Sequence, residues 1–220
     1  MSFSQNDNDD VFIKVDDGTS EGQKVGVGQK TMANSVPVVL ASDHSNINVL
    51  VVENKKKTYA AGVSGLVCPA AATDIFTITG SASKTIKVIK FHVDGTTTAG
   101  SGASVNFSLV KRSTADSAGT STTMTNVPFD SANAAATATV RAYTANPTLG
   151  TSVGAIVSDR LNVPTVGASG AGGGNPRWEF GYEDTQPIVL RGTSEQLCAN
   201  FGGATITNPV FSCFVQWTEE

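Results

Sequence analysis

The sequence predicts an all-β fold, and three observations support this. Val, Ile, Thr and Phe, which favour strands, are frequent, whereas Leu, Glu and Lys, which favour helices, are scarce. Apolar and polar residues alternate in several windows, which is the period of a strand with one buried face. No window sustains the 3.6-residue period of an amphipathic helix. We therefore expect strands and turns almost throughout, with at most one short turn of helix near Ser152–Asp159.

From Thr58 onward the alternation defines eight strand candidates separated by turn-forming residues. In one of them Val105, Phe107 and Leu109 share a face, and in another the apolar phase shifts at Val88–Ile89, which predicts a β-bulge. Eight strands is the number found in a jelly-roll sandwich, and this is the architecture that we expect for residues 58–220. The candidates are Asp74–Gly80, Thr85–Asp94, Ser104–Arg112, Thr137–Ala145, Arg177–Glu183, Ile188–Gly192, Leu197–Gly202 and Val210–Thr218.

Residues 1–57 differ from the rest and predict an extended N-terminal arm with short strands. Their apolar segments are brief and are separated by Gly, Asn, Asp and Ser, so they cannot build a core of their own. Such segments gain order by adding strands to another surface, and Pro37 restricts its strand to an edge. The run Lys55–Lys57 marks the hinge to the second domain. Short strands are expected at Val11–Val15, Val25–Gly28, Val36–Ala41 and Ile47–Val52.

The composition argues against several classes of protein. The net charge is −4, so there is no basic field to attract nucleic acid. No apolar run approaches the ~18 residues that a membrane helix needs, and the acidic start Met1–Asp10 is unlike a signal peptide. Cys68, Cys198 and Cys213 lie outside any CxxC or histidine-rich setting, so we expect buried thiols of a protein made in a reducing cytoplasm, not zinc ligands.

No catalytic, cofactor-binding or metal-binding set emerges, so we expect neither an enzyme nor a cofactor. His44 lies between an Asp and a Ser, but sequence neighbours cannot converge as a catalytic triad does. His92 falls in a strand, where it should face solvent or a subunit contact. The glycine run Gly170–Gly174 lacks the Gly-Lys-Ser/Thr ending of a phosphate loop. The acidic residues of the N-terminus miss the spacing of a calcium loop at Val11 and Phe12.

Trp178 and Tyr182 invite a carbohydrate-binding interpretation because acidic residues surround them. On a strand, however, Trp178, Phe180 and Tyr182 would share one face, while Glu179 and Glu183 would share the other. We therefore expect the aromatic row to belong to the core.

Two parts of the chain resemble virion proteins of tailed bacteriophages. The segment Asn34-Ser35-Val36-Pro37-Val38-Val39-Leu40-Ala41-Ser42-Asp43 resembles a stretch common near the N-termini of phage particle proteins, where it looks like an attachment arm. Val36 and His44 stand where Leu and Gln are more usual. The family has no catalytic residues to transfer. The remaining similarity is scattered over the β domain, at Thr73–Gly80, Leu109–Thr114, Arg141–Pro147, Ile188–Thr193 and Gln216–Glu220.

The resemblance implies a particle protein, and the arm, the low charge and the absence of a catalytic set favour a capsid decoration or cement protein among such proteins. We expect it to be a homotrimer, to bind the major capsid protein or another virion protein on the outer capsid surface, and to stabilise the shell. It would be located in the virion after assembly in the host cytoplasm, without nucleic acid or membrane as a partner. The alternatives are a tail, baseplate or head-fibre adaptor and, third, a host-glycan-binding module. The arm residues expected to bind the partner are Val36, Pro37, Val38, Val39, Leu40, Ile47, Val49 and Val51.

Overall fold

The structure is a computed structural model that describes residues 3–5, 11–13, 25–26, 56–166, 176–182 and 184–220. The chain divides into two compact units, Met1–Val52 and Glu53–Glu220. In the first unit, β1 (Phe3–Gln5), β2 (Val11–Ile13) and β3 (Val25–Gly26) form an antiparallel sheet in that order. The predicted strands Val36–Ala41 and Ile47–Val52 lie outside the described residues.

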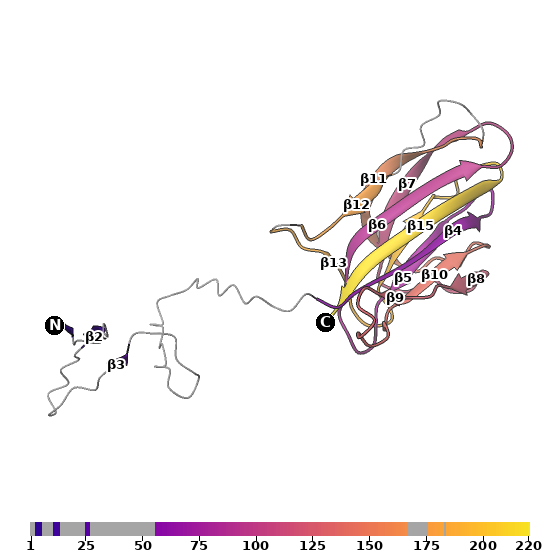
Figure 1. Ribbon diagram of the computed structural model, residues 1–220. Coiled ribbons are helices and arrows are strands. Elements are labelled where there is room, and N and C mark those ends of the chain that lie inside the picture. Colours follow the sequence, from indigo (N-terminus) through magenta and orange to yellow (C-terminus); the bar gives the residue numbers. More distant parts are fainter. Residues whose placement is uncertain (1–2, 6–10, 14–24, 27–55, 167–175, 183) are drawn as a thin grey trace. The chain divides into compact units, whose positions relative to one another are not determined.

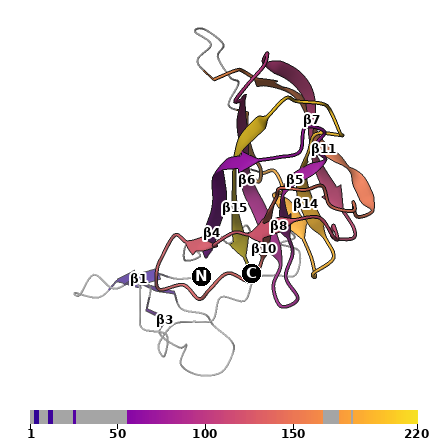
Figure 2. The same ribbon diagram turned by 90° about the vertical axis from the view of Figure 1, so that its right-hand side faces the viewer.

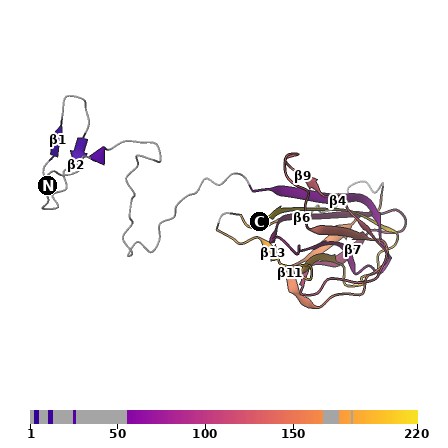
Figure 3. The same ribbon diagram turned by 90° about the horizontal axis from the view of Figure 1, so that it is seen from below.

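The second unit consists of two antiparallel sheets packed face to face. Sheet I has the order β12-β6-β15-β4-β9, with β13 also pairing with β6, and sheet II has the order β11-β7-β14-β5-β10-β8. β6, β15 and β4 run side by side (Figure 1), and Figure 2 and Figure 3 show sheets I and II as separate layers. The strands are β4 (Thr58–Val67), β5 (Asp74–Thr79), β6 (Ile86–Thr97), β7 (Ala103–Arg112), β8 (Ser121–Thr123), β9 (Val127–Pro128), β10 (Thr139–Tyr143), β11 (Ser152–Val163), β12 (Arg177–Glu179), β13 (Ile188–Leu190), β14 (Gln196–Asn200) and β15 (Pro209–Glu219).

The hydrophobic core lies between the two sheets and follows the predicted alternation. On β15, Phe211, Cys213, Val215 and Trp217 are all buried, as expected for one face of a strand. Trp217 stacks on Tyr59 of the neighbouring strand β4, with ring centroids 6.0 Å apart. Each fully buried aromatic side chain contributes about 2–3 kcal/mol relative to exposure, so these rings are a major source of the unit's stability.

The bulge expected at Val88–Ile89 is present in β6. Gln216 pairs with Lys90, whereas the next residue, Trp217, pairs with Val88, so Ile89 is the extra residue. The carbonyl of Ile89 accepts a hydrogen bond from the amide of Phe180, just after β12, at 2.9 Å. The shift of the apolar phase in the sequence therefore corresponds to a register shift in the sheet.

The predicted helical turn near Ser152–Asp159 is wrong, because these residues belong to strand β11. The strand count also changes: the eight candidates correspond to β5, β6, β7, β10, β12, β13, β14 and β15, and the structure describes four further strands in this unit. These four are β4, β8, β9 and β11. Arg177–Glu183 is shorter than predicted, because β12 ends at Glu179 and Gly181 then adopts a φ of 73° that turns the chain.

All three cysteines are buried and free, as predicted. Burial raises the pKa of the Cys68 thiol to about 12, and the pKa of Cys213 is raised for the same reason. Neither thiol is therefore nucleophilic at neutral pH. Among the residues that the structure describes, no helix is long and apolar enough to span a membrane.

Candidate functional site

The eight arm residues that the sequence assigns to partner binding, Val36 to Val51, lie outside the described residues. Their role therefore stays a prediction. The described residues instead bring together a polar site that no motif in the sequence indicates. It lies on the face of sheet II that points away from the core.

Alternation along sheet II places polar side chains on this outer face. Thr77 of β5, Arg112 of β7 and Cys198 and Gln196 of β14 point away from the core, yet all four are buried. They are buried because residues 113–120 and 144–151 fold over the sheet. The amides of Ser117 and Thr148 each donate to the other's carbonyl, at 3.0 and 2.7 Å, and so hold the two segments together. The outer face of sheet II therefore contains a second buried region, and this region is polar.

Arg112 is the centre of this polar region. Its Nε lies 2.7 Å from Oδ2 of Asp74 and 3.2 Å from Oδ1 of Asp116. Its Nη1 donates to the carbonyl of Gly150 at 2.8 Å. Asn200 donates to Asp74, and the amide of Gly150 donates to Asp116 at 2.8 Å. The ion pairs therefore attach the covering segments 113–120 and 144–151 to the sheet.

Burial and neighbouring charge shift the proton affinities in this network. Burial lowers the pKa of Arg112, but the hydrogen bond and charge of Asp74 outweigh it and raise the pKa above its usual value. Burial raises the pKa of Asp116 to about 7, and a hydrogen bond to Asp74 adds to the rise. Two carboxyl groups beside one guanidinium cannot both ionise without cost, so Asp116 titrates near neutral pH.

Asp74, Asp116 and Cys198 place potential metal-ligand atoms within 4.8 Å of one another. However, the Arg112 guanidinium already lies against both carboxylates and supplies the positive charge. Burial also raises the pKa of Cys198 well above its usual value. Its Sγ lies 3.4 Å from the Gln196 side-chain oxygen, where the protonated thiol donates a hydrogen bond. Thiolate is the metal-binding form, so this donor set fits an internal ion pair better than a metal centre.

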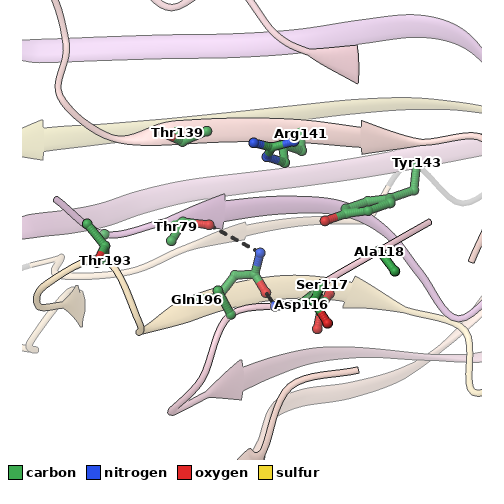
Figure 4. Close-up of a pocket in the computed structure, with 11 residues that line it drawn as sticks. Thr79, Asp116, Ser117, Ala118, Thr139, Arg141, Tyr143, Thr193 and Gln196 are labelled. Atoms are coloured by element: carbon green, nitrogen blue, oxygen red, sulfur yellow. Dashed lines mark hydrogen bonds between the residues drawn. The ribbon is translucent and has the colours of Figure 1, made fainter. Parts of the chain in front are cut away.

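Beside the network, a pocket of about 400 Å³ opens on the same outer face (Figure 4). Gln196 forms part of its floor and is fixed at both ends. Its Nε2 donates to the Thr79 hydroxyl at 3.1 Å, and its Oε1 accepts from the amide of Asp116 at 2.9 Å. The volume falls within the range of small-molecule sites. The lining residues are Thr79, Gly80, Ala115, Asp116, Ser117, Ala118, Thr139, Arg141, Tyr143, Thr193 and Gln196.

Strand β10 supplies the side of the pocket that carries the charge. Thr139, Arg141 and Tyr143 alternate along β10, so all three face outward. Arg141 is exposed and donates to the Ser121 hydroxyl at 3.3 Å, whereas the Asp116 side chain is fully buried. Figure 4 shows the Tyr143 hydroxyl directed toward Thr79 and Gln196. The pocket therefore presents one accessible guanidinium among hydroxyl groups.

The sequence contained one signal for this site. Thr139, Arg141 and Tyr143 form the polar phase of a predicted strand, but a polar face by itself also suits plain solvent exposure. Only the fold of the covering segment, which brings Ala115–Ala118 opposite them, turns the face into a pocket.

The aromatic row around Trp178 behaves largely as predicted. Trp178 stacks on Phe107 with ring centroids 5.0 Å apart and an interplanar angle of 11°, and Phe180 also packs on the core. The prediction that Tyr182 belongs to the core is wrong, since this residue is 70% exposed. Glu179 pairs with Arg177 and Lys90, at 2.7 and 3.1 Å. Phe107 covers a face of the Trp178 ring, as expected for an aromatic residue that belongs to the core.

His92 is half-buried on the outer face of sheet I, consistent with the expected strand position. With Lys90, Arg177, Phe214 and Gln216 it lines an open hollow of about 560 Å³. His44 lies outside the described residues.

Comparison with known proteins adds no assignment. No protein-family model, no curated protein and no solved structure matches the chain.

Proposed function

We propose that the chain is a non-enzymatic structural protein of a bacteriophage particle, a capsid decoration or cement protein. Its N-terminal arm binds the outer capsid surface, with the major capsid protein or another virion protein as partner, and so stabilises the shell. The observation that carries the proposal is the division of labour along the chain. The described core, from Tyr59 to Trp217, lies in the sandwich unit, whereas the sequence of residues 1–57 carries short apolar segments, Val36–Ala41 and Ile47–Val52, of which the first resembles the attachment arm of phage particle proteins.

The finer fold that we propose for the sandwich is a jelly roll, and the pairing order supports it. In a jelly roll the eight strands pair first with last, second with seventh, third with sixth and fourth with fifth. Here β4 pairs with β15, β5 with β14 and β7 with β11, while β6 pairs with β12 and β13 as one interrupted strand. β10, β8 and β9 extend the sheets at their margins.

Exposed apolar side chains near the sheet edges support contacts with other subunits. Val153 and Ile156, on the outermost strand β11, are 64% and 43% exposed. Phe129, next to the edge strand β9, is 62% exposed and Val127 within it is also exposed. Edge strands with apolar side chains readily add to another chain. Such edges suit a homotrimer on a capsid surface, where repeated weak contacts combine into high avidity.

Binding to particles tests the proposal. Capsids that lack the protein are mixed with the full chain or with a chain from which residues 1–52 are deleted, and bound protein is measured by co-sedimentation. We expect the full chain to bind and the truncated chain to stay in solution. The deletion retains Lys56, which forms an ion pair with Glu220, and Lys57, whose carbonyl accepts a hydrogen bond from the amide of Glu219. Equal binding by the truncated chain would contradict the arm model.

Copy number separates the decoration role from the alternative of a tail, baseplate or head-fibre adaptor, which would use the same arm. Quantification of the protein in purified particles, relative to the major capsid protein, should give hundreds of copies for a decoration protein. A few dozen copies or fewer would instead assign it to the tail or to a vertex structure.

A further inference from the structure

We propose that the pocket on the outer face of sheet II is a binding site for a small polyhydroxylated carboxylate, with an acidic sugar residue as its occupant. The site consists of Thr139, Arg141 and Tyr143 on one side and Ser117 and Thr193 on the other. The inference concerns the sandwich unit alone and does not depend on the virion proposal. It is distinct from the aromatic row around Trp178.

Arg141 selects for a carboxylate. Its guanidinium projects from β10 and, in the described part of the chain, belongs to none of the ion pairs. A guanidinium offers five donors in a planar fork that matches the two oxygens of a carboxylate. Its hydrogen bond to the Ser121 hydroxyl, at 3.3 Å, uses one nitrogen. A ligand carboxylate can therefore reach the remaining donors without displacing an ion pair.

The charge of the pocket argues for one negative charge on the ligand. Arg141 is the one cationic residue in the lining, and the one acidic lining residue, Asp116, has a fully buried side chain that is paired with Arg112. A phosphate carries close to two negative charges and is usually held by several cationic or amide donors. A single carboxylate matches a single guanidinium.

Hydroxyl groups around Arg141 select for a ligand with several hydroxyls. Ser117, Thr139, Thr193 and the Tyr143 phenol each can both donate and accept a hydrogen bond. Such groups suit the ring hydroxyls of a sugar, which also act as donors and acceptors. The volume of about 400 Å³ accommodates a monosaccharide or a short oligosaccharide end.

The floor is held rigid before a ligand arrives. Gln196 bridges Thr79 and the Asp116 amide, and the Arg112 ion pairs fix the covering segment that carries Ser117. Rigid placement of the polar groups lowers the entropy lost on binding. The buried network therefore acts as the scaffold of the pocket, which accounts for an ion pair on the outer face of a sheet.

Ligand titration of the full-length protein tests the proposal. The probes are glucuronic acid and N-acetylneuraminic acid, with glucose as the uncharged control, and binding is followed by chemical-shift changes in protein NMR spectra. We expect both acids to bind and glucose to bind at least about 10-fold more weakly, because it lacks the charge-assisted hydrogen bonds. The shifts should centre on β10 and residues 115–118.

Two variants assign the binding to Arg141. Arg141→Gln should weaken binding by about 10- to 100-fold, the loss expected for hydrogen bonds to a charged group. The matched control is Arg160→Gln: Arg160 is an exposed arginine of β11 that bonds to Ser104 and Asn106, away from the pocket. This control should keep wild-type affinity, and both variants should keep the wild-type Tm because both side chains are exposed.

The methyl glycosides of the two acids distinguish a glycan end from a free hydroxy acid such as tartrate, since a glycan-linked sugar is blocked at its anomeric carbon. Binding of the glycosides identifies a glycan end, and binding of tartrate alone identifies a free hydroxy acid; both outcomes uphold the site. No binding of any acid at about 20 mM, equal binding of glucose, or unchanged affinity in Arg141→Gln would overturn it.

Discussion

Asp116 is the residue whose chemistry most clearly depends on the fold. It comes four residues after Arg112, with which it forms an ion pair. Burial raises the pKa of Asp116 from 3.8 to about 7. A carboxyl group that binds its proton more tightly in the folded chain than in the unfolded chain stabilises the fold most at low pH. That contribution falls as the pH rises from about 4 to about 7.

Replacing Asp116 by Asn should remove this pH dependence, because the amide stays neutral like the protonated acid. The free energy of unfolding of Asp116→Asn minus that of the wild type should increase by about 2–4 kcal/mol between pH 4 and pH 8. Urea unfolding at a series of pH values measures this difference, and groups common to both proteins cancel. A difference that stays constant with pH would show that Asp116 does not titrate in this range.

The network around Arg112 could not be predicted from the sequence, although the strands that carry Arg112 and Asp74 were predicted. Arg112 and Asp74 are 38 positions apart, and each occupies the polar phase of its strand, where solvent exposure is the usual outcome. What buries them is the contact between two loop segments, residues 113–120 and 144–151. Loop conformations depend on tertiary contacts that a local pattern does not contain.

At the scale of elements, Glu219 joins the two sheets. It lies at the end of β15 in sheet I, is buried, and accepts hydrogen bonds from the amides of Thr137 and Ala138, which lead into β10 of sheet II. It also accepts from the indole of Trp217 at 3.1 Å. Burial opposes ionisation, but these donors outweigh it and lower the pKa of Glu219. The buried carboxylate thus anchors the start of β10 to the neighbouring sheet.

Glu219→Gln should destabilise the protein by about 3 kcal/mol, because the new amide group places donors opposite donors. The adjacent Glu220 is the matched control, since it forms surface ion pairs with Lys56 and Lys87. Glu220→Gln should change stability by less than about 0.5 kcal/mol. Urea unfolding of both variants at pH 7 makes the comparison. Equal effects of the two substitutions would remove the special role of Glu219.

The success of strand prediction depended on how regular each strand is. β7 and β15 could be predicted because their apolar residues keep a period of two, as at Val105, Phe107 and Leu109 of β7. β11 was mistaken for a helical turn because Val153 and Ile156 are extra residues at two register shifts. The resulting spacing of Val153, Ile156 and Val157 imitates the period of a helix. β4 was missed because a further shift, next to Gly65 with a φ of 74°, breaks its alternation.

At the scale of the whole molecule, the stability of the sandwich unit should be independent of the N-terminal unit. The described core runs from Tyr59 to Trp217, and the contacts of Lys56 and Lys57 with the C-terminal residues lie after residue 52. Cooperative unfolding of a unit depends on its own buried surface. The segment that we propose to bind the particle therefore precedes every residue of the described core in the chain.

Deletion of residues 1–52 should accordingly change the Tm of the sandwich unit by less than about 3 °C, which corresponds to less than about 1 kcal/mol for a domain of this size. Differential scanning calorimetry of the full and truncated chains makes the measurement. It also controls the particle-binding experiment, because a truncated chain with an unchanged Tm that no longer binds has lost its arm and not its fold. A large fall in Tm would instead show that residues 1–52 stabilise the sandwich, and loss of particle binding would then no longer identify them as an attachment arm.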